Sequence, residues 1–159
     1  MADRAKQVGE VLGILGVIGS LAFVALEVRQ NTAAVRGATV QAVSQQSLDL
    51  AMAGLNNPDI RAAFIAAYEA ANPEEIAPEH QEVLSWFLAS KLRADENRFR
   101  QVQLGTLDAS TFSQLGNNRI YQYSFFGWWW ARNGAEYAAD FQEVVEREFL
   151  PLSGTAQSR

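Results

Sequence analysis

The chain has no cysteine and a single histidine, His80. The lack of cysteine excludes disulfides and thiolate metal sites, and one histidine is too few for a nitrogen-rich metal site. No serine stands in a nucleophile-elbow motif that could use His80, and no glycine-rich loop between a strand and a helix offers a phosphate or dinucleotide site. We therefore expect no metal, no cofactor, no catalytic residue and no enzymatic activity.

Positive charge is also scarce, with 13 Lys and Arg against 18 Asp and Glu and a net charge of −5. Nucleic-acid binding and attachment to anionic lipid both depend on a basic surface, so neither a nucleic-acid partner nor a polybasic membrane contact is expected. Few segments alternate with period two, whereas helical periodicity recurs. We predict an all-α protein with an N-terminal transmembrane helix, separate from or continuous with a long following helix, and a small helical bundle.

One long hydrophobic run stands out at residues 8–28, and its centre, residues 11–26, has no charge, Pro, Asn or Gln. A bilayer core about 30 Å thick needs roughly 20 apolar residues, and Glu10, Glu27 and Arg29 can lie at the headgroups and lengthen the span. A buried core helix of a soluble protein is the alternative. A cleaved signal peptide fits poorly, because the run passes into more helix without a cleavage site.

These features divide the sequence into a membrane anchor over residues 1–30, a helical bundle over residues 31–150 and a flexible tail over residues 151–159. Two basic residues precede the run and two closely follow it. The positive-inside rule therefore gives no orientation, and we favour a cytoplasmic C-terminal domain.

Small residues recur along the hydrophobic run at Gly9, Gly13, Gly16 and Ser20. Spacings of four, three and four place them on one face of a helix. Small residues let a second helix approach closely in lipid, so this stripe predicts a helix-packing interface for self-association or for docking onto a larger membrane protein. The alternative is that small residues are simply common in membrane helices.

Prolines, glycines and helical periodicity define the elements after the anchor. The predicted helices cover residues 32–55, 58–71, 79–104 and 135–149. The second of these is predicted to bury Ile60, Phe64, Ile65 and Tyr68. A further short helix is predicted to bury Phe112 and Leu115.

Aromatic residues concentrate in one segment that contains Trp128, Trp129 and Trp130. Adjacent residues on a helix lie about 100° apart, so three tryptophans cannot share one face. At least one is therefore expected to contact solvent, lipid headgroups or a partner. The alternative is a core plug with the indole N–H groups bonded to backbone carbonyls.

The densest charged patch runs from Lys91 to Arg100. Pairs one turn apart, such as Lys91 and Asp95, are typical of a solvated face with surface salt bridges. A sharper hypothesis assigns a structural polar motif that holds helices together through buried polar bonds. Its members are Arg29, Gln30, Asn31, Arg93, Glu96 and Asn97.

The segment Ile18–Thr32, which ends in Arg29-Gln30-Asn31-Thr32, resembles the start of a widespread family of uncharacterised small bacterial single-pass membrane proteins. Glu96-Asn97, the Gly105–Asp108 segment and the tryptophans near residue 128 are similar to later motifs of that family. The resemblance implies a bacterial inner-membrane location and an N-terminal hydrophobic helix, and it carries no activity.

The function that we expect is a membrane-anchored, non-enzymatic interaction or scaffold protein. It would self-assemble into a homo-oligomer or serve as an accessory subunit of a larger membrane complex. The alternative is a membrane-tethered ligand-sensing bundle, with a pocket lined by Tyr121, Tyr123, Phe125 and Trp128.

Overall fold

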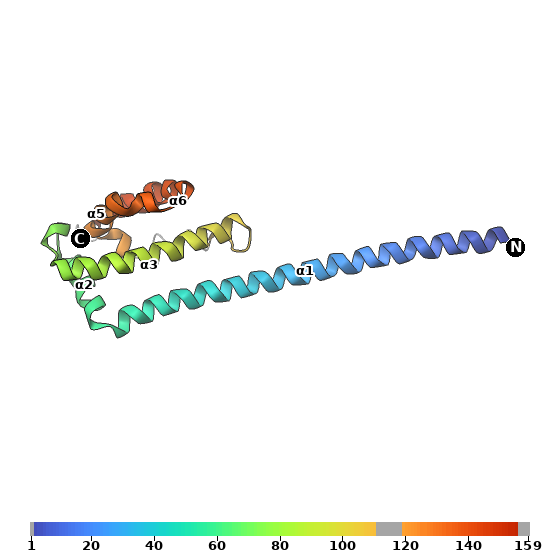
Figure 1. Ribbon diagram of the computed structural model, residues 1–159, viewed down its shortest axis with the longest axis horizontal. Helices are drawn as coiled ribbons and strands as arrows, with labels where there is room; N and C mark the ends of the chain where they lie inside the picture. The colour runs from blue at the N-terminus through green and yellow to red at the C-terminus, as the bar shows by residue number, and fades with distance from the viewer. Residues whose placement is uncertain (1, 111–118, 156–159) are drawn as a thin grey trace. The chain divides into compact units, whose positions relative to one another are not determined.

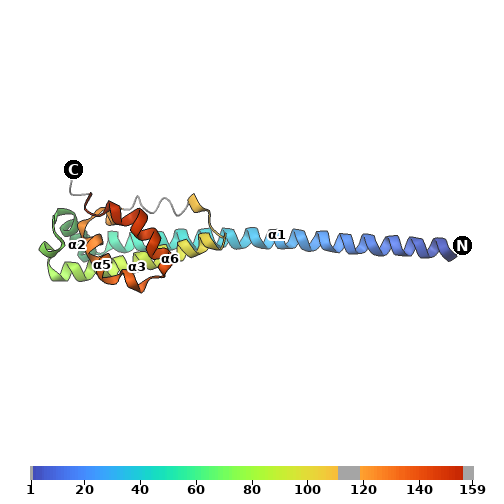
Figure 2. The same ribbon diagram turned by 90° about the horizontal axis from the view of Figure 1, so that it is seen from above.

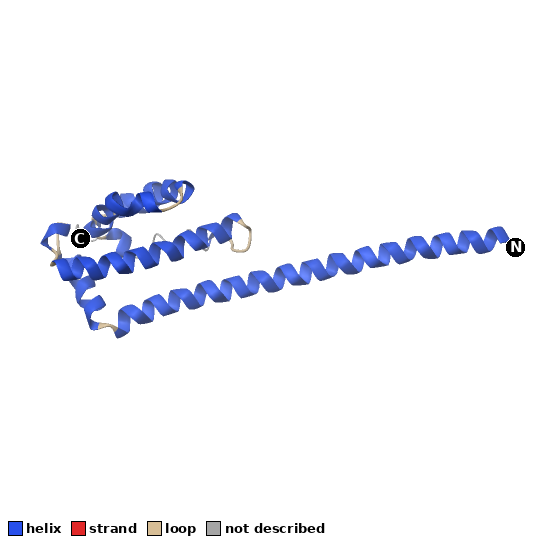
Figure 3. Cartoon of the chain, viewed as in Figure 1, coloured by secondary structure: helices blue, strands red, loops and turns tan. Residues whose placement is uncertain are grey.

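The computed structural model describes residues 2–110 and 119–155, and within these ranges it contains helices and turns but no strand (Figure 3). The all-α prediction is confirmed. The predicted burial of Phe112 and Leu115 lies outside the described residues, as does the end of the predicted tail, residues 156–159.

The first helix, α1, runs without interruption over Ala2–Asn56 (Figure 1). Its serine and threonine hydroxyls donate to the carbonyl four residues earlier, as Ser20 does to Gly16 at 2.8 Å and Thr32 to Val28 at 2.8 Å. These polar groups are therefore satisfied inside the helix. Of the two predicted arrangements, a separate or a continuous following helix, the structure shows the continuous one.

Helix α1 belongs to two compact units, Met1–Val40 and Gln41–Arg159. The division falls ten residues after the boundary predicted at residue 30, and α1 continues through both positions. Among the described residues, α1 is the one helix long and apolar enough to cross a membrane. None of its apolar window is buried within the chain, so the structure does not support the alternative of a core helix.

Helix α2, Pro58–Glu69, begins where α1 ends. Asn57 takes an extended backbone with φ −102° and ψ 114°, as a residue before proline prefers. Its side chain accepts from the N–H groups of Asp59 at 2.9 Å and Ile60 at 3.3 Å. A single residue therefore both ends α1 and caps α2.

The predicted buried face of α2 is wrong in part. Ile65 and Tyr68 are each 52% exposed, whereas Ala63 and Ala67 are fully buried. Small side chains at these positions let the backbone of α2 pack closely against the core. The buried face of α2 is therefore set by close packing, and the hydrophobicity of the side chains alone does not predict it. Phe64 remains at the interface, edge-on to Phe87 at 4.9 Å between ring centroids.

Helix α3, Pro78–Gln103, follows the short 3-10 turn η1, Pro73–Glu75, and packs against α2. Gly105, with φ +70°, terminates it in the left-handed region that favours glycine. Helices α5, Ser124–Asn133, and α6, Ala139–Val144, lie along one side of α3 (Figures 1 and 2).

Short elements complete this unit. They are η3, Arg119–Gln122; η4, Gly134–Glu136; the π-helical η5, Val145–Phe149; and η6, Leu150–Leu152. Tyr121 stacks on Phe149 at 4.9 Å and packs edge-on against Phe126 at the same centroid distance. Segments distant in sequence thus share one aromatic core.

The tail predicted over residues 151–159 is packed at its start. The Ser153 hydroxyl donates to the carbonyl of Tyr123 at 3.1 Å and accepts from the N–H of Gly127 at 3.0 Å. A Cβ on Gly127 would lie 2.7 Å from the Ser153 Oγ, so only glycine fits there without movement. Ser153 therefore ties the start of the segment predicted to be flexible to α5.

Candidate functional site

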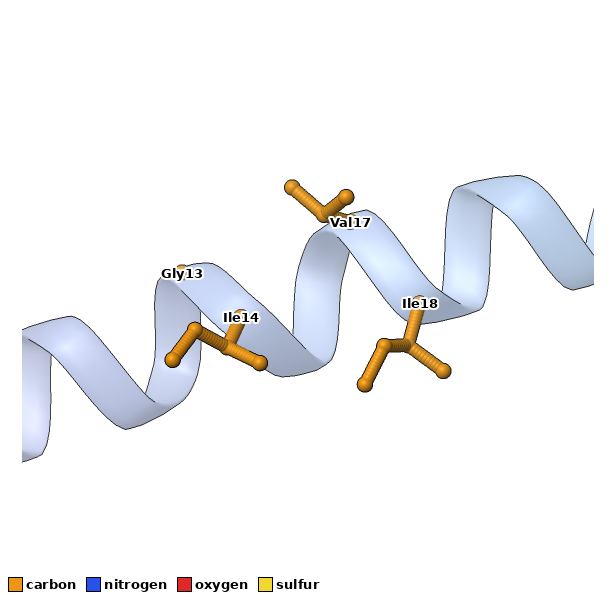
Figure 4. A pocket seen from close by; sticks show the side chains of 4 residues that line it. All are labelled: Gly13, Ile14, Val17 and Ile18. Atoms are coloured by element: carbon orange, nitrogen blue, oxygen red, sulfur yellow. The ribbon is translucent and has the colours of Figure 1, made fainter.

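The small-residue stripe lies on the exposed surface of α1. A Cβ added at Gly9, Gly13 or Gly16 would meet nothing within 4 Å. Gly13 also opens a shallow apolar groove, lined further by Ile14, Val17 and Ile18 (Figure 4). The stripe is therefore accessible to a second helix, and its predicted role as a packing interface stays a prediction.

Arg29, Gln30 and Asn31 are also exposed on α1, and Gln30 and Asn31 line a second shallow groove with Glu27. Because these side chains lie in the unit Met1–Val40, they are not grouped with the polar residues of α3. The polar motif inferred from the sequence is thus not assembled as one cluster within either unit.

A buried ionic cluster lies on α3, formed by Lys91, Asp95 and Arg98. Asp95 is fully buried, and Lys91 and Arg98 are 6% and 5% exposed. The Arg98 Nη1 donates to Asp95 Oδ1 at 2.7 Å, and the Lys91 Nζ donates to Asp95 Oδ2. The predicted solvated face is therefore wrong for these three residues.

Tyr121, from η3, completes the cluster from across the bundle. Its hydroxyl donates to Asp95 Oδ2 and accepts from Lys91 Nζ at 3.2 Å. Burial raises the pKa of Tyr121 well above its ordinary value, and the Asp95 carboxylate adds to this rise. Tyr121 therefore remains a protonated donor, and Asp95 accepts hydrogen bonds from three side chains.

Two cations thus surround one carboxylate away from solvent. Burial lowers the pKa of Lys91, with a further lowering from Arg98, and the attraction of Asp95 opposes both. Removing one partner of a buried ion pair typically costs about 3–5 kcal/mol, because the other charge is left uncompensated. Asp95 is therefore the residue on which the cluster depends.

The cluster also reaches α1 through Ser47. The Arg98 Nη2 donates to the Ser47 Oγ, and the Ser47 hydroxyl donates to the Val43 carbonyl at 2.7 Å. The hydrogen bonds therefore run from η3 through α3 to the last part of α1. The arrangement connects three elements, and its chemistry is that of a structural polar network.

Arg93 and Glu96, predicted to hold helices together, lie on a different face of α3. Glu96 accepts from the N–H of Ala138 at 2.9 Å and from Arg93 at 3.0 Å. The Arg93 guanidinium lies 4.3 Å from the ring centroid of Tyr137. Both residues contact the segment before α6, whereas Asn97 is exposed.

A second polar contact joins α3 to α6. The Arg100 guanidinium donates to both carboxylate oxygens of Asp140, at 2.6 and 2.8 Å, and Gln103 donates at 3.0 Å. Hydrogen bonds from Gln103 and Arg100 lower the pKa of Asp140. Both charged side chains are about two-fifths exposed, so this pair is weaker than the buried cluster.

The three adjacent tryptophans differ in burial, as expected for residues that lie about 100° apart on a helix. Trp129 and Trp130 are each 4% exposed, and Trp128 is half-buried with the Arg132 guanidinium 3.8 Å from its ring centroid. The Trp128 Nε1 is buried without a hydrogen-bond partner among the described residues. Among the described residues, the aromatic side chain with the largest exposed fraction is Trp86, at 71%, which no pattern in the sequence indicated.

The side chains proposed to line a ligand pocket belong mainly to the core. Tyr121, Tyr123 and Phe125 are buried, and Phe125 stacks with Trp128 at 5.3 Å. Tyr123 packs edge-on against Phe64 at 6.4 Å. Their rings therefore contact one another and the surrounding helices.

The ionic cluster can be recognised in the sequence from the spacing of its residues, although the residues are not hydrophobic. Spacings of four and three residues alternate along one face of α3 in the series Leu84, Leu88, Lys91, Asp95, Arg98 and Val102. This is the spacing of core positions in packed helices. Charged residues at three consecutive core positions indicate a buried polar network.

Comparison of the chain with protein-family models, curated proteins and solved structures finds no match.

Proposed function

We propose that the chain is a non-enzymatic interaction protein anchored by α1 in a bacterial inner membrane, with a cytoplasmic bundle. One observation carries the anchor. Ten large apolar side chains of α1, from Leu12 to Val28, are each 52–67% exposed. Burying such a side chain contributes about 1.5–3 kcal/mol, and a lipid bilayer provides those surroundings. The resemblance at Arg29–Thr32 supports the same architecture.

Membrane fractionation tests the anchor. We expect the full-length chain to stay with membranes through an alkaline carbonate wash and to be released by detergent. Replacing Leu15 and Ile18 with arginine should reduce retention, because each charge at the centre of a span costs about 2.5–3.5 kcal/mol. A matched pair of arginines at Gln45 and Gln46 should leave retention unchanged. Release of the native chain without detergent would overturn the proposal.

We further propose that the stripe of Gly9, Gly13, Gly16 and Ser20 is the interface through which the chain associates with itself or with another membrane subunit. The support is its exposure on a helix that has no neighbour within 4 Å of these glycines. Lipid tails offer no hydrophobic driving force between helices, so close backbone packing is the favourable term at such a stripe.

The absence of native cysteine makes crosslinking specific to introduced residues. Ser20→Cys should form a disulfide-linked dimer in membranes, whereas Ala22→Cys, which lies about 200° further around the helix, should not. Gly16→Leu should abolish the Ser20→Cys crosslink, and Ala22→Leu, on the other side of the helix, should preserve it. Equal crosslinking at both cysteines would contradict a specific interface. Copurification with other subunits in mild detergent would identify an accessory role instead.

A further inference from the structure

The last part of α1, Gln41–Asn56, makes a narrow contact with the bundle. Val43 is its one buried residue, whereas Leu48, Met52 and Leu55 are 53%, 44% and 67% exposed. Helix α2, by contrast, buries Ala63 and Ala67 completely against the core. Little apolar area therefore holds this part of α1 in place.

The polar contact at this interface can open without leaving an unsatisfied group. When Arg98 and Ser47 separate, Arg98 keeps its bond to Asp95, and the Ser47 hydroxyl keeps its bond to the Val43 carbonyl. The Arg98 Nη2 and the Ser47 Oγ can then bind water, so opening replaces one protein hydrogen bond with hydrogen bonds to water. This differs from the Asp95 contacts, whose loss strands a buried charge.

The connection between α1 and α2 is a single residue long. Asn57 alone connects α1 to α2, and it caps α2 through its own side chain. Across the turn, a Cβ added at Gly54 would be in ordinary van der Waals contact with the Ile60 side chain, at 3.9 Å, so no tight packing locks the two helices there. Helix α2 thus stays capped when α1 moves about Asn57.

We propose that Gln41–Asn56 is a strap that docks reversibly on α3, with the Arg98–Ser47 hydrogen bond as its latch and Asn57 as its hinge. Release of the strap uncovers the Arg98 end of the ionic cluster, while Asp95 retains Lys91 and Tyr121. Because α1 is one continuous helix, a rotation of its anchored part also turns Ser47. That coupling rests on the proposed membrane anchor, whereas reversible docking does not.

Spin labels on the full-length chain test the strap. Gln46→Cys and Ser90→Cys place one label on α1 and one on α3, and the chain has no other cysteine. In detergent micelles, pulsed electron–electron distance measurements should show a narrow docked population and a broad released one. Ser47→Ala should lower the docked-to-released ratio about tenfold, the expected effect of losing a hydrogen bond to a charged group. Ser44→Ala, on an exposed face of the same helix, should leave the ratio unchanged.

Hydrogen exchange provides a readout that does not depend on labels. Backbone amides of residues 43–53 should exchange faster than those of residues 84–92, because a released helix without packing against α3 opens locally more often, and Ser47→Ala should widen that difference. A single narrow distance with equal protection of both segments would overturn the strap. Equal effects of Ser47→Ala and Ser44→Ala would overturn the latch. Carbonate fractionation tests the anchor separately, so the two proposals fail independently.

Discussion

Replacing Asp95 by asparagine is expected to destabilise the bundle severely while preserving the shape of the side chain. Asp95 is fully buried and accepts hydrogen bonds from Lys91, Arg98 and Tyr121. Asparagine removes the negative charge and turns one acceptor into a donor that faces other donors. Two buried cations are then left without a counter-charge, at a cost of about 3–5 kcal/mol. Domains are stable by about 5–15 kcal/mol, so this loss is a large fraction of the total.

Urea unfolding in detergent micelles, followed by tryptophan fluorescence, measures this loss. Asp140→Asn is the matched control, since it breaks a bidentate pair with Arg100 whose side chains are 42% and 41% exposed. Exposed pairs contribute little, because solvent screens their attraction and two long side chains must be ordered to form them. Lys91→Met should also cost little, because Arg98 and Tyr121 still bond to Asp95 and one desolvated cation is removed. Equal losses in Asp95→Asn and Asp140→Asn would refute the central role of the cluster.

Four further predictions concern packing, helix propensity and ionisation. Gly127→Ala should lower the free energy of unfolding by about 1–3 kcal/mol, because its Cβ would lie 2.7 Å from Ser153 Oγ; Gly37→Ala, with nothing within 4 Å, should instead raise helix stability by about 0.5–1 kcal/mol in thermal melts. Ala63→Leu should separate α2 from α3 and lower the melting temperature, since Ala63 has no exposed area. Burial raises the pKa of Tyr137 to about 12, from 10.0, so the unfolded chain ionises first and stability from this group should be lost as pH rises from 10.0 towards 12; phenolate absorbance and urea unfolding of Tyr137→Phe check this.

The boundaries of the first helices could be predicted because local chemistry sets them. Pro58 excludes a helical conformation at Asn57, and Gly105 supplies the positive φ that ends α3. The absence of any proline before Pro58 leaves α1 free to continue. These rules act on neighbouring residues, so no tertiary contact needs to be known.

The buried face of α2 could not be predicted in the same way. Ile65 and Tyr68 have larger apolar side chains than Ala63 and Ala67, yet the alanines are the residues that are buried. The separation between the two helices decides which side chains fit, and that separation depends on both helices together. Likewise Tyr121 meets Asp95 across 26 residues of sequence, a contact that no local spacing reveals.

The ionic cluster shows how a hydrophobic pattern and a core pattern can differ. Lys91, Asp95 and Arg98 continue the face of Leu84 and Leu88, but their charges suggest a surface when each pair is taken alone. Apolar residues at these positions could give equal or greater stability. The charged residues contribute specific hydrogen bonds. Asp95 accepts a hydrogen bond from Tyr121, and Arg98 donates one to Ser47. These hydrogen bonds favour one arrangement of η3, α3 and the last part of α1 over alternatives that bury a similar apolar area. Among them, the bond between Arg98 and Ser47 is the one that can break without leaving a buried charge unpaired.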